Sequence, residues 1–377
     1  MPSIFFLSLM NGAAWGGSEE IWYKTALYCV AGRWKVGCAA FEWKAKETQL
    51  TTLEKNGCHV YRIPNKGRSK KNIVEKVLYK FTKRQQVRFC RSLPFNEYDL
   101  VVVNLGGYEI CTSQWRNFYT RLHKYALVFH NYNEDAIWSK DKATVLKEWI
   151  FNAKKNLFDA AKICSVLEKQ LNTAIPNARV ITNPITFSPP ASPTPLSPLH
   201  ESCYVFTMLA ALDVSRKAQD NLITALSSLQ WKERDWILYL YGEGHDRQKL
   251  DDLIRQMQLE DKVFLKGHTY NVQKVLEESH LVLQITHMDA MPISVVEAMA
   301  MSRPLVVSNI GDMPLWVHEN ENGWVSKDGS VEEINKALEK AWNKRNDWNK
   351  MGENSFSVFK ERFPQSAEQY FLDQLNN

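Results

Sequence analysis

The sequence predicts an α/β protein made of two Rossmann-like, doubly wound domains that face one another across a deep cleft. Short apolar runs of β type alternate with helical patterns along the whole chain, which is typical of parallel sheets. The 377 residues exceed what one ordinary core encloses. Five prolines within Ser188–Pro198 can neither continue a helix nor pair in a sheet, and the strand–helix rhythm restarts after them.

The proline-rich segment sets the predicted boundaries. We expect a first domain over residues 1–187, a stiff linker over 188–200 and a second domain over 201–363, with a C-terminal helix over 364–377 packing back on the first domain. The strand candidates of the first domain are Ile4–Met10, Val36–Phe41, His59–Ile63, Leu100–Leu105, Ala126–His130, Ile163–Val166 and Val180–Asn183. Those of the second are Tyr204–Leu212, Trp236–Tyr241, Val263–Gly267, Leu281–Ile285 and Pro304–Ser308, with helices such as Gln219–Leu229 and Arg247–Met257 between them.

The composition favours a soluble protein, with 45% hydrophobic and 24% charged residues and no apolar run long enough to cross a bilayer. The run Ile4–Met10 lacks a basic segment before it and ends at Asn11, so it predicts a first strand rather than a signal peptide. The seven cysteines are scattered without a Cys-x-x-Cys pair, and the histidines show no metal-ligand spacing. We therefore expect a cytoplasmic protein with reduced thiols and no metal site.

The segment Asp289–Ala300 carries the most chemistry. Asp289 stands where the chain leaves a predicted strand, and Glu297 lies in a helical run among apolar residues. A carboxylate in such surroundings needs a partner, and the hydroxyl groups of a ligand would serve. Free N–H groups at the start of the same helix suit a phosphate. Together these features predict a site for a nucleotide sugar.

Small and basic residues follow the first strand of each domain. Gly16 and Gly17, with Ser18 as a helix cap, would let the backbone approach a phosphate closely, although an ordinary glycine-containing loop is the alternative. Arg216 and Lys217 could neutralise a diphosphate, and solvated cations at a helix start are the alternative.

Three further strand exits are predicted to line the cleft. His130 ends an apolar strand at the edge where parallel sheets bind ligands, although a structural histidine is the usual alternative. Gly242 follows a second strand, and His268 with Thr269 follow a third. His268 and Thr269 could flank a nucleotide base, or they could be merely structural loop residues.

These features, in this order, resemble the retaining glycosyltransferases of family 4, which have the GT-B fold. Asp289-x7-Glu297-Ala298-Met299-Ala300 matches the family's Glu-x7-Glu motif and its Glu-Ala-Met-Ala, with aspartate in place of the first glutamate. The other matching segments are Gly16-Gly17-Ser18-Glu19 (first phosphate loop), Ile181-Thr182-Asn183-Pro184-Ile185 (end of the acceptor domain), Lys217-Ala218-Gln219-Asp220 (Lys-Gly-x-Asp) and Asn322-Gly323-Trp324-Val325 (Asn-Gly-hydrophobic). The likeness covers nearly the whole chain.

The resemblance implies an acceptor-binding first domain and a second domain that binds a UDP- or GDP-sugar. The resemblance implies that Glu297 binds the ribose and that Asp289 contacts the sugar, as does His130 from the opposite domain. Lys217 would neutralise the diphosphate, with Arg216 as a candidate second cation. The backbone of Met291, Pro292 and Ile293 would supply further contacts. Gly16, Gly17, Gly242, His268 and Thr269 complete the expected donor site. In this family the leaving diphosphate is thought to help deprotonate the acceptor, so the chemistry is mainly positioning and charge stabilisation. No cofactor or metal is expected.

Residues 62–91 form a basic stretch whose only acid is Glu75, with apolar residues at roughly helical spacing. A basic amphipathic helix of this kind favours an anionic membrane surface, while a solvated surface helix is the alternative. We expect peripheral docking on the inner face of the cytoplasmic membrane, close to a lipid-linked or saccharide acceptor, and no nucleic-acid partner.

The predicted function is therefore retaining transfer of a hexose to an acceptor hydroxyl in the synthesis of cell-envelope polysaccharide, lipopolysaccharide or glycolipid. A nucleotide-sugar epimerase or hydrolase of similar fold is one alternative, but it would need more acid and base groups than His130 and the two carboxylates. A catalytically weak sugar-nucleotide-binding protein is another, because Asp289, Ala211 and Leu315 replace family residues. We expect Glu297→Ala to abolish donor binding or turnover and to leave the fold intact.

Overall fold

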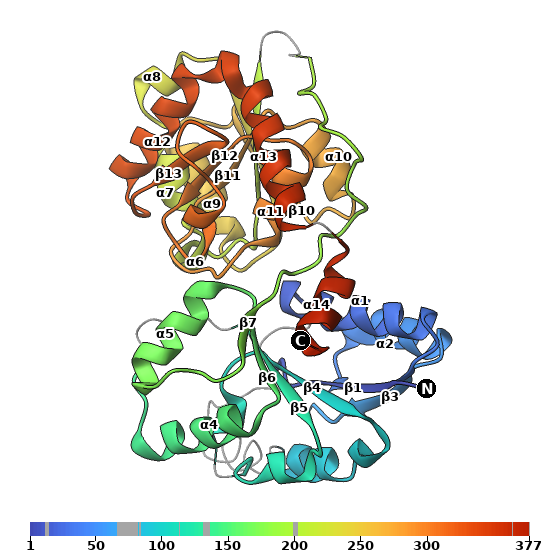
Figure 1. Cartoon of the computed structure of the whole chain (residues 1–377). Helices are drawn as coiled ribbons and strands as arrows, with labels where there is room; N and C mark the ends of the chain where they lie inside the picture. Colours follow the sequence, from blue (N-terminus) through green and yellow to red (C-terminus); the bar gives the residue numbers. More distant parts are fainter. Residues whose placement is uncertain are drawn as a thin grey trace. The chain divides into compact units, whose positions relative to one another are not determined.

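The computed structural model describes residues 1–11, 15–65, 82, 84–112, 114–130, 136–198, 203–363 and 365–376 of the chain. The chain divides into two compact units (Figure 1). Unit 1 comprises Met1–Pro184 together with Gln365–Asn377, and unit 2 comprises Ile185–Pro364. Most of the basic stretch 62–91 lies outside the described residues.

Unit 1 is built on a seven-stranded parallel sheet in the order β3-β2-β1-β4-β5-β6-β7. Side chains alternate between the two faces of this sheet. On β1, Phe6 belongs to the core cluster that also contains Trp22, whereas the ring of Phe5 lies 5.0 Å from that of Phe95 on the other face. The strands are β1 (Ser3–Ser8), β2 (Lys35–Phe41), β3 (His59–Ile63), β4 (Leu100–Leu105), β5 (Tyr125–Phe129), β6 (Lys155–Phe158) and β7 (Ala178–Val180).

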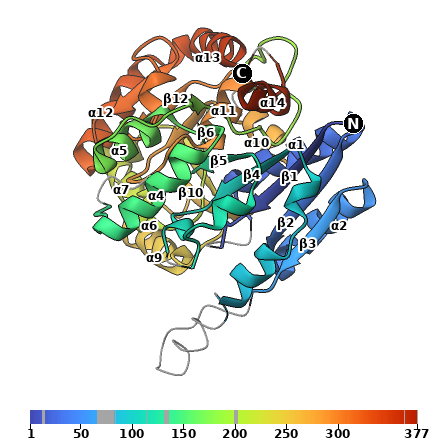
Figure 2. The ribbon, with the colours of Figure 1, turned by 60° about the horizontal axis from the view of Figure 1, so that its bottom comes forward.

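The helices of unit 1 include one from the far end of the sequence. Figures 1 and 2 show α14 beside α1, where Phe371, Leu372 and Leu375 join the same core cluster as Ile21 and Trp22. The last helix therefore completes the first unit. The helices are α1 (Gly17–Ala31), α2 (Glu47–Lys55), α4 (Lys140–Asn152), α5 (Ala161–Leu171) and α14 (Ala367–Asn376), with short 3-10 segments η1 (Lys44–Lys46), η2 (Phe95–Glu97), η3 (Glu109–Cys111) and η4 (Phe118–Arg121).

Unit 2 is built on a six-stranded parallel sheet in the order β10-β9-β8-β11-β12-β13. Its core gathers aromatic rings around β8, where Phe206 stacks on Trp236 with centroids 5.8 Å apart. The strands are β8 (Tyr204–Leu209), β9 (Trp236–Tyr241), β10 (Val263–Gly267), β11 (Leu281–Gln284), β12 (Leu305–Ser308) and β13 (Gly323–Ser326). The helices are α6 (Val214–Lys217), α7 (Gln219–Ala225), α8 (Leu229–Lys232), α9 (Arg247–Gln256), α10 (Val272–Glu277), α11 (Ile293–Ala300), α12 (Val331–Asn343) and α13 (Trp348–Arg362), with 3-10 segments η5 (Met313–Leu315) and η6 (Arg345–Asp347).

Several predicted elements are wrong in detail. The predicted strand Ile163–Val166 lies inside helix α5, where Ile163, Leu167 and Leu171 are buried at the i, i+4, i+8 spacing of one helical face. The strand at that place in the sheet is β6, which ends eight residues earlier in the chain than the predicted strand. The predicted helix Gln219–Leu229 is two helices, α7 and α8, and the sequence analysis missed β13.

The proline-rich segment belongs to unit 2 and lies against its surface. Thr194 donates to the hydroxyl of Ser302 and the carbonyl of Met301, at 3.0 and 2.6 Å. The buried guanidinium of Arg303 donates to the carbonyl of Pro195 at 3.1 Å. Side-chain and backbone groups of unit 2 thus form hydrogen bonds with a segment whose prolines prevent regular helix or sheet pairing.

Candidate functional site

The expected donor-binding residues gather at the carboxyl edge of the unit 2 sheet. In the order β10-β9-β8-β11 these strands are neighbours, so the loops that follow them lie side by side. Open parallel sheets bind ligands at this edge. The residues concerned are Arg216 and Lys217 after β8, Gly242 after β9, His268 and Thr269 after β10, and Asp289, Met291, Pro292 and Ile293 after β11.

Lys217 and Asp289 form an ion pair through Nζ and Oδ2. Their side chains are 13% and 18% exposed, so solvent or a ligand still reaches them. The two loops are tied together because the carbonyl of Arg216 accepts from the N–H of His287 at 2.7 Å and from the hydroxyl of Thr286 at 2.6 Å. The guanidinium of Arg216 is exposed to solvent. This ion pair therefore places a cation that could bind a diphosphate beside a carboxylate that could accept from the hydroxyl groups of a sugar.

The loop after β11 leads into helix α11. Pro292 precedes this eight-residue helix in an extended conformation and makes no side-chain capping hydrogen bond. Gly311, at φ +58°, lets the next loop approach, because a Cβ there would lie 1.9 Å from the carbonyl oxygen of Ala290. Asp312 then donates its N–H to that oxygen at 2.8 Å. Backbone donors and the positive helix end thus lie beside Asp289.

Glu297 is buried in α11, with 4% of its surface exposed. Its Oε1 accepts from the N–H of Thr186 at 2.9 Å and from the Thr186 hydroxyl at 2.5 Å. Thr186 is an exposed residue of the segment that opens unit 2. The carboxylate therefore already has protein partners, which the sequence analysis did not foresee. The Glu297 carboxylate therefore has a structural role in addition to any contact with a ligand.

A cavity of about 340 Å³ opens at the ends of β8, β9 and β10. Gly242 lines it at φ +143° and passes close to the residue that follows β8, where a Cβ would lie 2.0 Å from the carbonyl oxygen of Ala210. The ring of His268 meets that of Tyr270 edge to face at 4.6 Å. The lining residues are Leu209, Ala210, Ala211, Tyr241, Gly242, Glu243, His268, Thr269 and Val272. A flat heterocyclic base would fit such a cavity with apolar walls and a few polar groups.

The glycine loop of unit 1 leads directly into α1, which begins at Gly17. Gly16 has an extended backbone, and a Cβ there would meet no atom of the described residues within 4 Å. Ser18 is the second residue of the helix and not its cap. Glu19, expected as part of a phosphate loop, points inward: it is fully buried and forms an ion pair with the fully buried Lys46.

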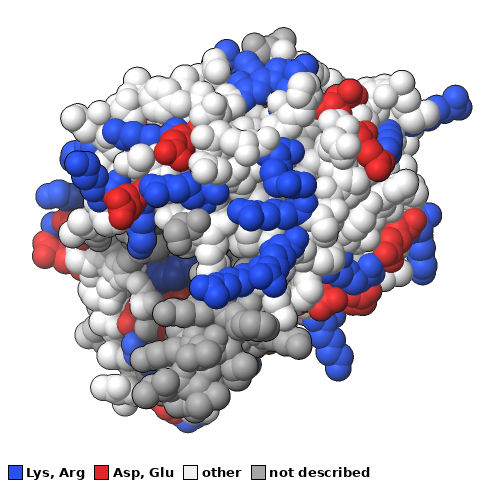
Figure 3. Space-filling model, turned by 90° about the horizontal axis from the view of Figure 1, so that it is seen from below, with Lys and Arg blue, Asp and Glu red and all other residues white. Residues whose placement is uncertain are grey.

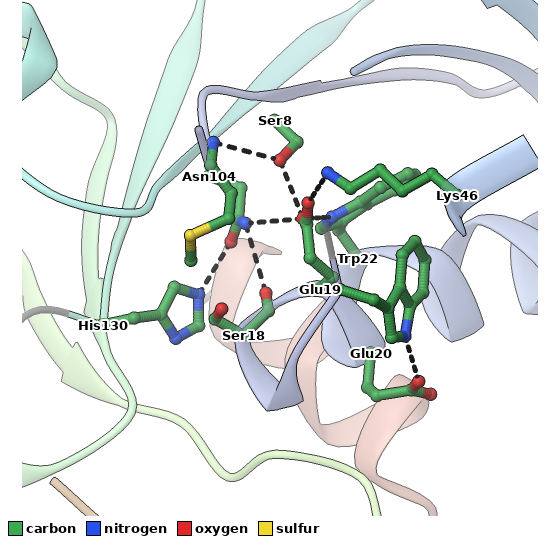
Figure 4. Close-up of polar contacts among 10 residues, drawn as sticks. Ser8, Ser18, Glu19, Glu20, Trp22, Lys46, Asn104 and His130 are labelled. Atoms are coloured by element: carbon green, nitrogen blue, oxygen red, sulfur yellow. Dashed lines mark hydrogen bonds and ion pairs between the residues drawn. The ribbon is translucent and has the colours of Figure 1, made fainter. Parts of the chain in front are cut away.

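His130 lies directly after β5, at the carboxyl edge of the unit 1 sheet, and both of its ring nitrogens face protein groups. Nδ1 lies 2.7 Å from Oδ2 of Asp159, and Nε2 lies 2.7 Å from Oδ1 of Asn104. Figure 4 shows Asn104 between His130 and the Glu19–Lys46 pair. The His130 and Asp159 side chains are 4% and 7% exposed.

Sequence reasoning missed four polar residues that hold these groups: Thr186, Asn104, Asp159 and Lys46. Asn104 and Asp159 had a usable signal, since each stands at the end of an apolar run, as His130 does. Thr186 and Lys46 had none, because nothing in their local sequence indicates a distant carboxylate.

One group of possible metal ligands occurs among the described residues. Asp213, His245 and Asp246 have ligand atoms within 4.8 Å of one another. Both carboxylates already accept hydrogen bonds from protein groups. Asp213 accepts from the Ser215 hydroxyl, and Asp246 accepts from the N–H of Val214 at 2.8 Å. They stabilise the start of α6, and metal independence stays a prediction.

Known proteins resemble part of this sequence, and solved structures resemble its whole fold. Residues 199–358 match the model of the family Glycosyl transferases group 1. Poly(ribitol-phosphate) alpha-N-acetylglucosaminyltransferase of Staphylococcus aureus is 31% identical over 122 residues, which cover 32% of this chain and 25% of that enzyme. Poly(glycerol-phosphate) alpha-glucosyltransferase of Bacillus subtilis is 29% identical over 154 residues, 39% of this chain and 23% of that enzyme. The matches thus span about a quarter of these relatives.

Solved structures match the chain from end to end. HepE of Anabaena in complex with UDP superposes with a TM-score of 0.76 at 18% identity, covering 99% of both chains. TarM of S. aureus superposes with a TM-score of 0.74 at 14% identity, covering 100% of this chain and 99% of TarM. The chain has the GT-B fold with two Rossmann-like α/β domains, as the resemblance implied. No helix of the described part is long and apolar enough to span a membrane.

Proposed function

We propose that this protein is a glycosyltransferase that moves a hexose from a nucleotide-diphosphate sugar to an acceptor hydroxyl with retention of configuration. The observation that carries the proposal is the single edge of unit 2 that brings together the Lys217–Asp289 pair, the start of α11 and the cavity beside Gly242. This edge lies within the part of the sequence that matches the glycosyltransferase family. Glu297, in the same helix, is assigned to the donor ribose.

UDP is the nucleotide that we propose first. HepE is known in complexes with UDP and with UDP-glucose, and its fold aligns with nearly all of this chain. We assign the base to the cavity between Gly242 and His268, and the diphosphate to Lys217 and to the backbone N–H groups from Met291 to Ile293.

The proposed reaction depends on charge at the leaving diphosphate. As the bond from the sugar to the diphosphate breaks, negative charge grows on the phosphate oxygens, and the Lys217 ammonium and the positive end of α11 are in place to stabilise it. Lys217 has three N–H donors, so it can bind phosphate and keep Asp289 as a second partner. Asp289 would then accept from sugar hydroxyls through its remaining lone pairs. The diphosphate would take the acceptor proton.

An acceptor in the cell envelope is the second part of the proposal. Two relatives act on poly(ribitol-phosphate) and poly(glycerol-phosphate), which are polyanions. Figure 3 looks onto the lower face of Figure 1, where Lys and Arg side chains lie across the centre and Asp and Glu lie toward the sides. A cationic surface favours an anionic acceptor or an anionic membrane.

Peripheral docking of residues 62–91 on anionic lipid is proposed for the same reason. Three exposed arginines of the stretch, Arg84, Arg88 and Arg91, are among the described residues. Arg62 does not add to them, because its guanidinium is paired with Glu47 and Glu54. Co-sedimentation with vesicles containing anionic lipid, compared with neutral vesicles, tests this part: equal or absent binding to both would contradict it.

Titration calorimetry with UDP and GDP tests the donor assignment. We expect binding of one nucleotide per chain with a preference for UDP. Absence of binding to either nucleotide would leave a silent assembly protein as the better explanation. An epimerase or hydrolase would instead convert a bound nucleotide sugar without any acceptor, which product analysis by mass spectrometry and NMR detects.

A further inference from the structure

A line of polar side chains crosses the carboxyl edge of the unit 1 sheet. Neighbouring strands contribute one residue each, in the spatial order β1, β4, β5, β6 and β7. The residues in that order are Ser8, Asn104, His130, Asp159 and Asn183, and Figure 4 shows the first three. One end of the line rests on the buried Glu19–Lys46 pair.

Glu19 is an acceptor only. Its Oε2 accepts from the hydroxyl of Ser8 at 2.7 Å and from the indole N–H of Trp22, which can only donate. The Lys46 ammonium, which also can only donate, binds Oε1. Both side chains of the pair are fully buried, so neither charge is stable in this place without the other.

The anion at Glu19 fixes the orientation of Asn104. Nδ2 of Asn104 lies 3.3 Å from Oε2 of Glu19 and 3.1 Å from the carbonyl oxygen of Ser18. Both neighbours are acceptors, so the NH₂ group of the amide must face them. Its oxygen then faces Nε2 of His130 at 2.7 Å, and Nε2 must carry a proton to make that contact favourable.

The other ring nitrogen is occupied in the same way. Oδ2 of Asp159 lies 2.7 Å from Nδ1 and also accepts from Nδ2 of Asn183 at 3.2 Å. Nδ1 therefore also faces a protein oxygen, and neither ring nitrogen is directed at a ligand. We propose that Asn104 is a positioning residue that locks Nε2 of His130 in the protonated form. Consequently His130 is not the base that removes the acceptor proton.

The lock has a clear spectroscopic consequence. If Asn104 becomes leucine, Nε2 loses its acceptor, and a neutral ring will place its single proton on Nδ1, toward the Asp159 carboxylate. Nε2 then becomes an unprotonated nitrogen. A wild-type ring would not show this form, whereas the variant would. The position of this proton can therefore be measured without any substrate.

The experiment is NMR of the full chain carrying ¹⁵N-labelled histidine, with His130 assigned through His130→Gln. In the wild type we expect a protonated Nε2. In Asn104→Leu we expect the Nδ1-protonated tautomer. Asn152→Leu, an exposed asparagine on α4, is the matched control and should leave the His130 signals unchanged. An unprotonated Nε2 in the wild type overturns the proposal even if the variants fail to fold.

A kinetic arm rests on the proposed function. Asn104→Leu should lower kcat about tenfold to a hundredfold, as misplaced groups in active sites do. The dissociation constant for UDP should stay within about twofold, because nucleotide binding is assigned to unit 2. Failure of the wild type to bind nucleotide contradicts the proposed function and leaves the NMR result standing. Unchanged kcat with an altered tautomer contradicts the positioning role alone.

Discussion

Replacing Glu297 by glutamine separates its structural role from its proposed ligand role. The substitution keeps the volume and one carbonyl oxygen, which can still accept from the N–H and hydroxyl of Thr186, now 2.9 and 2.5 Å from Oε1. Hydrogen bonds to a charged group contribute about 1.5–3 kcal/mol, against about 0.5–1.5 kcal/mol for neutral ones. Thr186 is exposed, so water offsets part of the difference. We expect unit 2 to lose about 1 kcal/mol of stability.

The effect on nucleotide binding should be larger. If the carboxylate accepts the ribose hydroxyls, its loss removes about 1.5–3 kcal/mol of binding free energy, which weakens UDP binding about 10-fold to 150-fold. Titration calorimetry measures this change, and urea unfolding measures the stability. Glu233→Gln, an exposed glutamate of the same unit, is the control. A folded Glu297→Gln variant that binds UDP as tightly as the wild type would refute the assignment. Glu297→Ala is no longer expected to leave the fold untouched, because it removes both contacts to Thr186.

Four further substitutions test other parts of the proposal. Lys217→Ala should lower kcat about 10²-fold to 10³-fold with a smaller effect on UDP binding, because the ammonium acts on charge that develops at the leaving group; steady-state kinetics with an unchanged kcat would point to Arg216 instead. Gly311→Ala places a Cβ 1.9 Å from the carbonyl oxygen of Ala290 at φ +58°, so stability should fall by about 1–3 kcal/mol and UDP binding should weaken. Gly16→Ala, which meets nothing within 4 Å, should keep its stability within about 0.5 kcal/mol, and equal losses in the two variants would contradict the explanation. Burial lowers the pKa of His280, whose Nδ1 accepts from the N–H of Val205, so the folded state resists protonation. Stability should therefore fall as the pH drops below about 6.5, by up to about 1.4 kcal/mol per pH unit, and His280→Gln should abolish this slope in urea unfolding.

The strand-and-helix plan was predictable because its signals are local. Apolar runs such as Leu100–Leu105 and Trp236–Tyr241 are strands with those bounds, since a parallel strand is buried on both faces and reads as continuous apolar sequence. The segment Ile163–Val166 was wrongly predicted to be a strand because it is also a short run of apolar and small residues. Four apolar or small residues on one helical turn look like a short strand, and only the wider spacing of the buried Ile163, Leu167 and Leu171 distinguishes them.

The candidate site was predictable where a motif sits on one stretch of chain. The loop after β11 and helix α11 occupy the place that their sequence indicated. The partners of the site were not predictable, because each comes from a distant part of the sequence: Thr186 is 111 residues from Glu297, and Asn104 is 26 residues from His130. A buried carboxylate such as Glu19 requires a cation as its partner. Only the fold shows that this cation is the ammonium of Lys46.

The most direct test of the central claim is product analysis with the full chain. The protein is incubated with UDP-sugars and GDP-sugars, with and without polyol-phosphate polymers or envelope glycolipids, and products are identified by mass spectrometry and NMR. The account predicts UDP release coupled to the addition of one sugar to an acceptor hydroxyl in the donor's own anomeric configuration, and loss of that product in Lys217→Ala. Conversion of the nucleotide sugar to an epimer or to free sugar at the same rate without acceptor would contradict it.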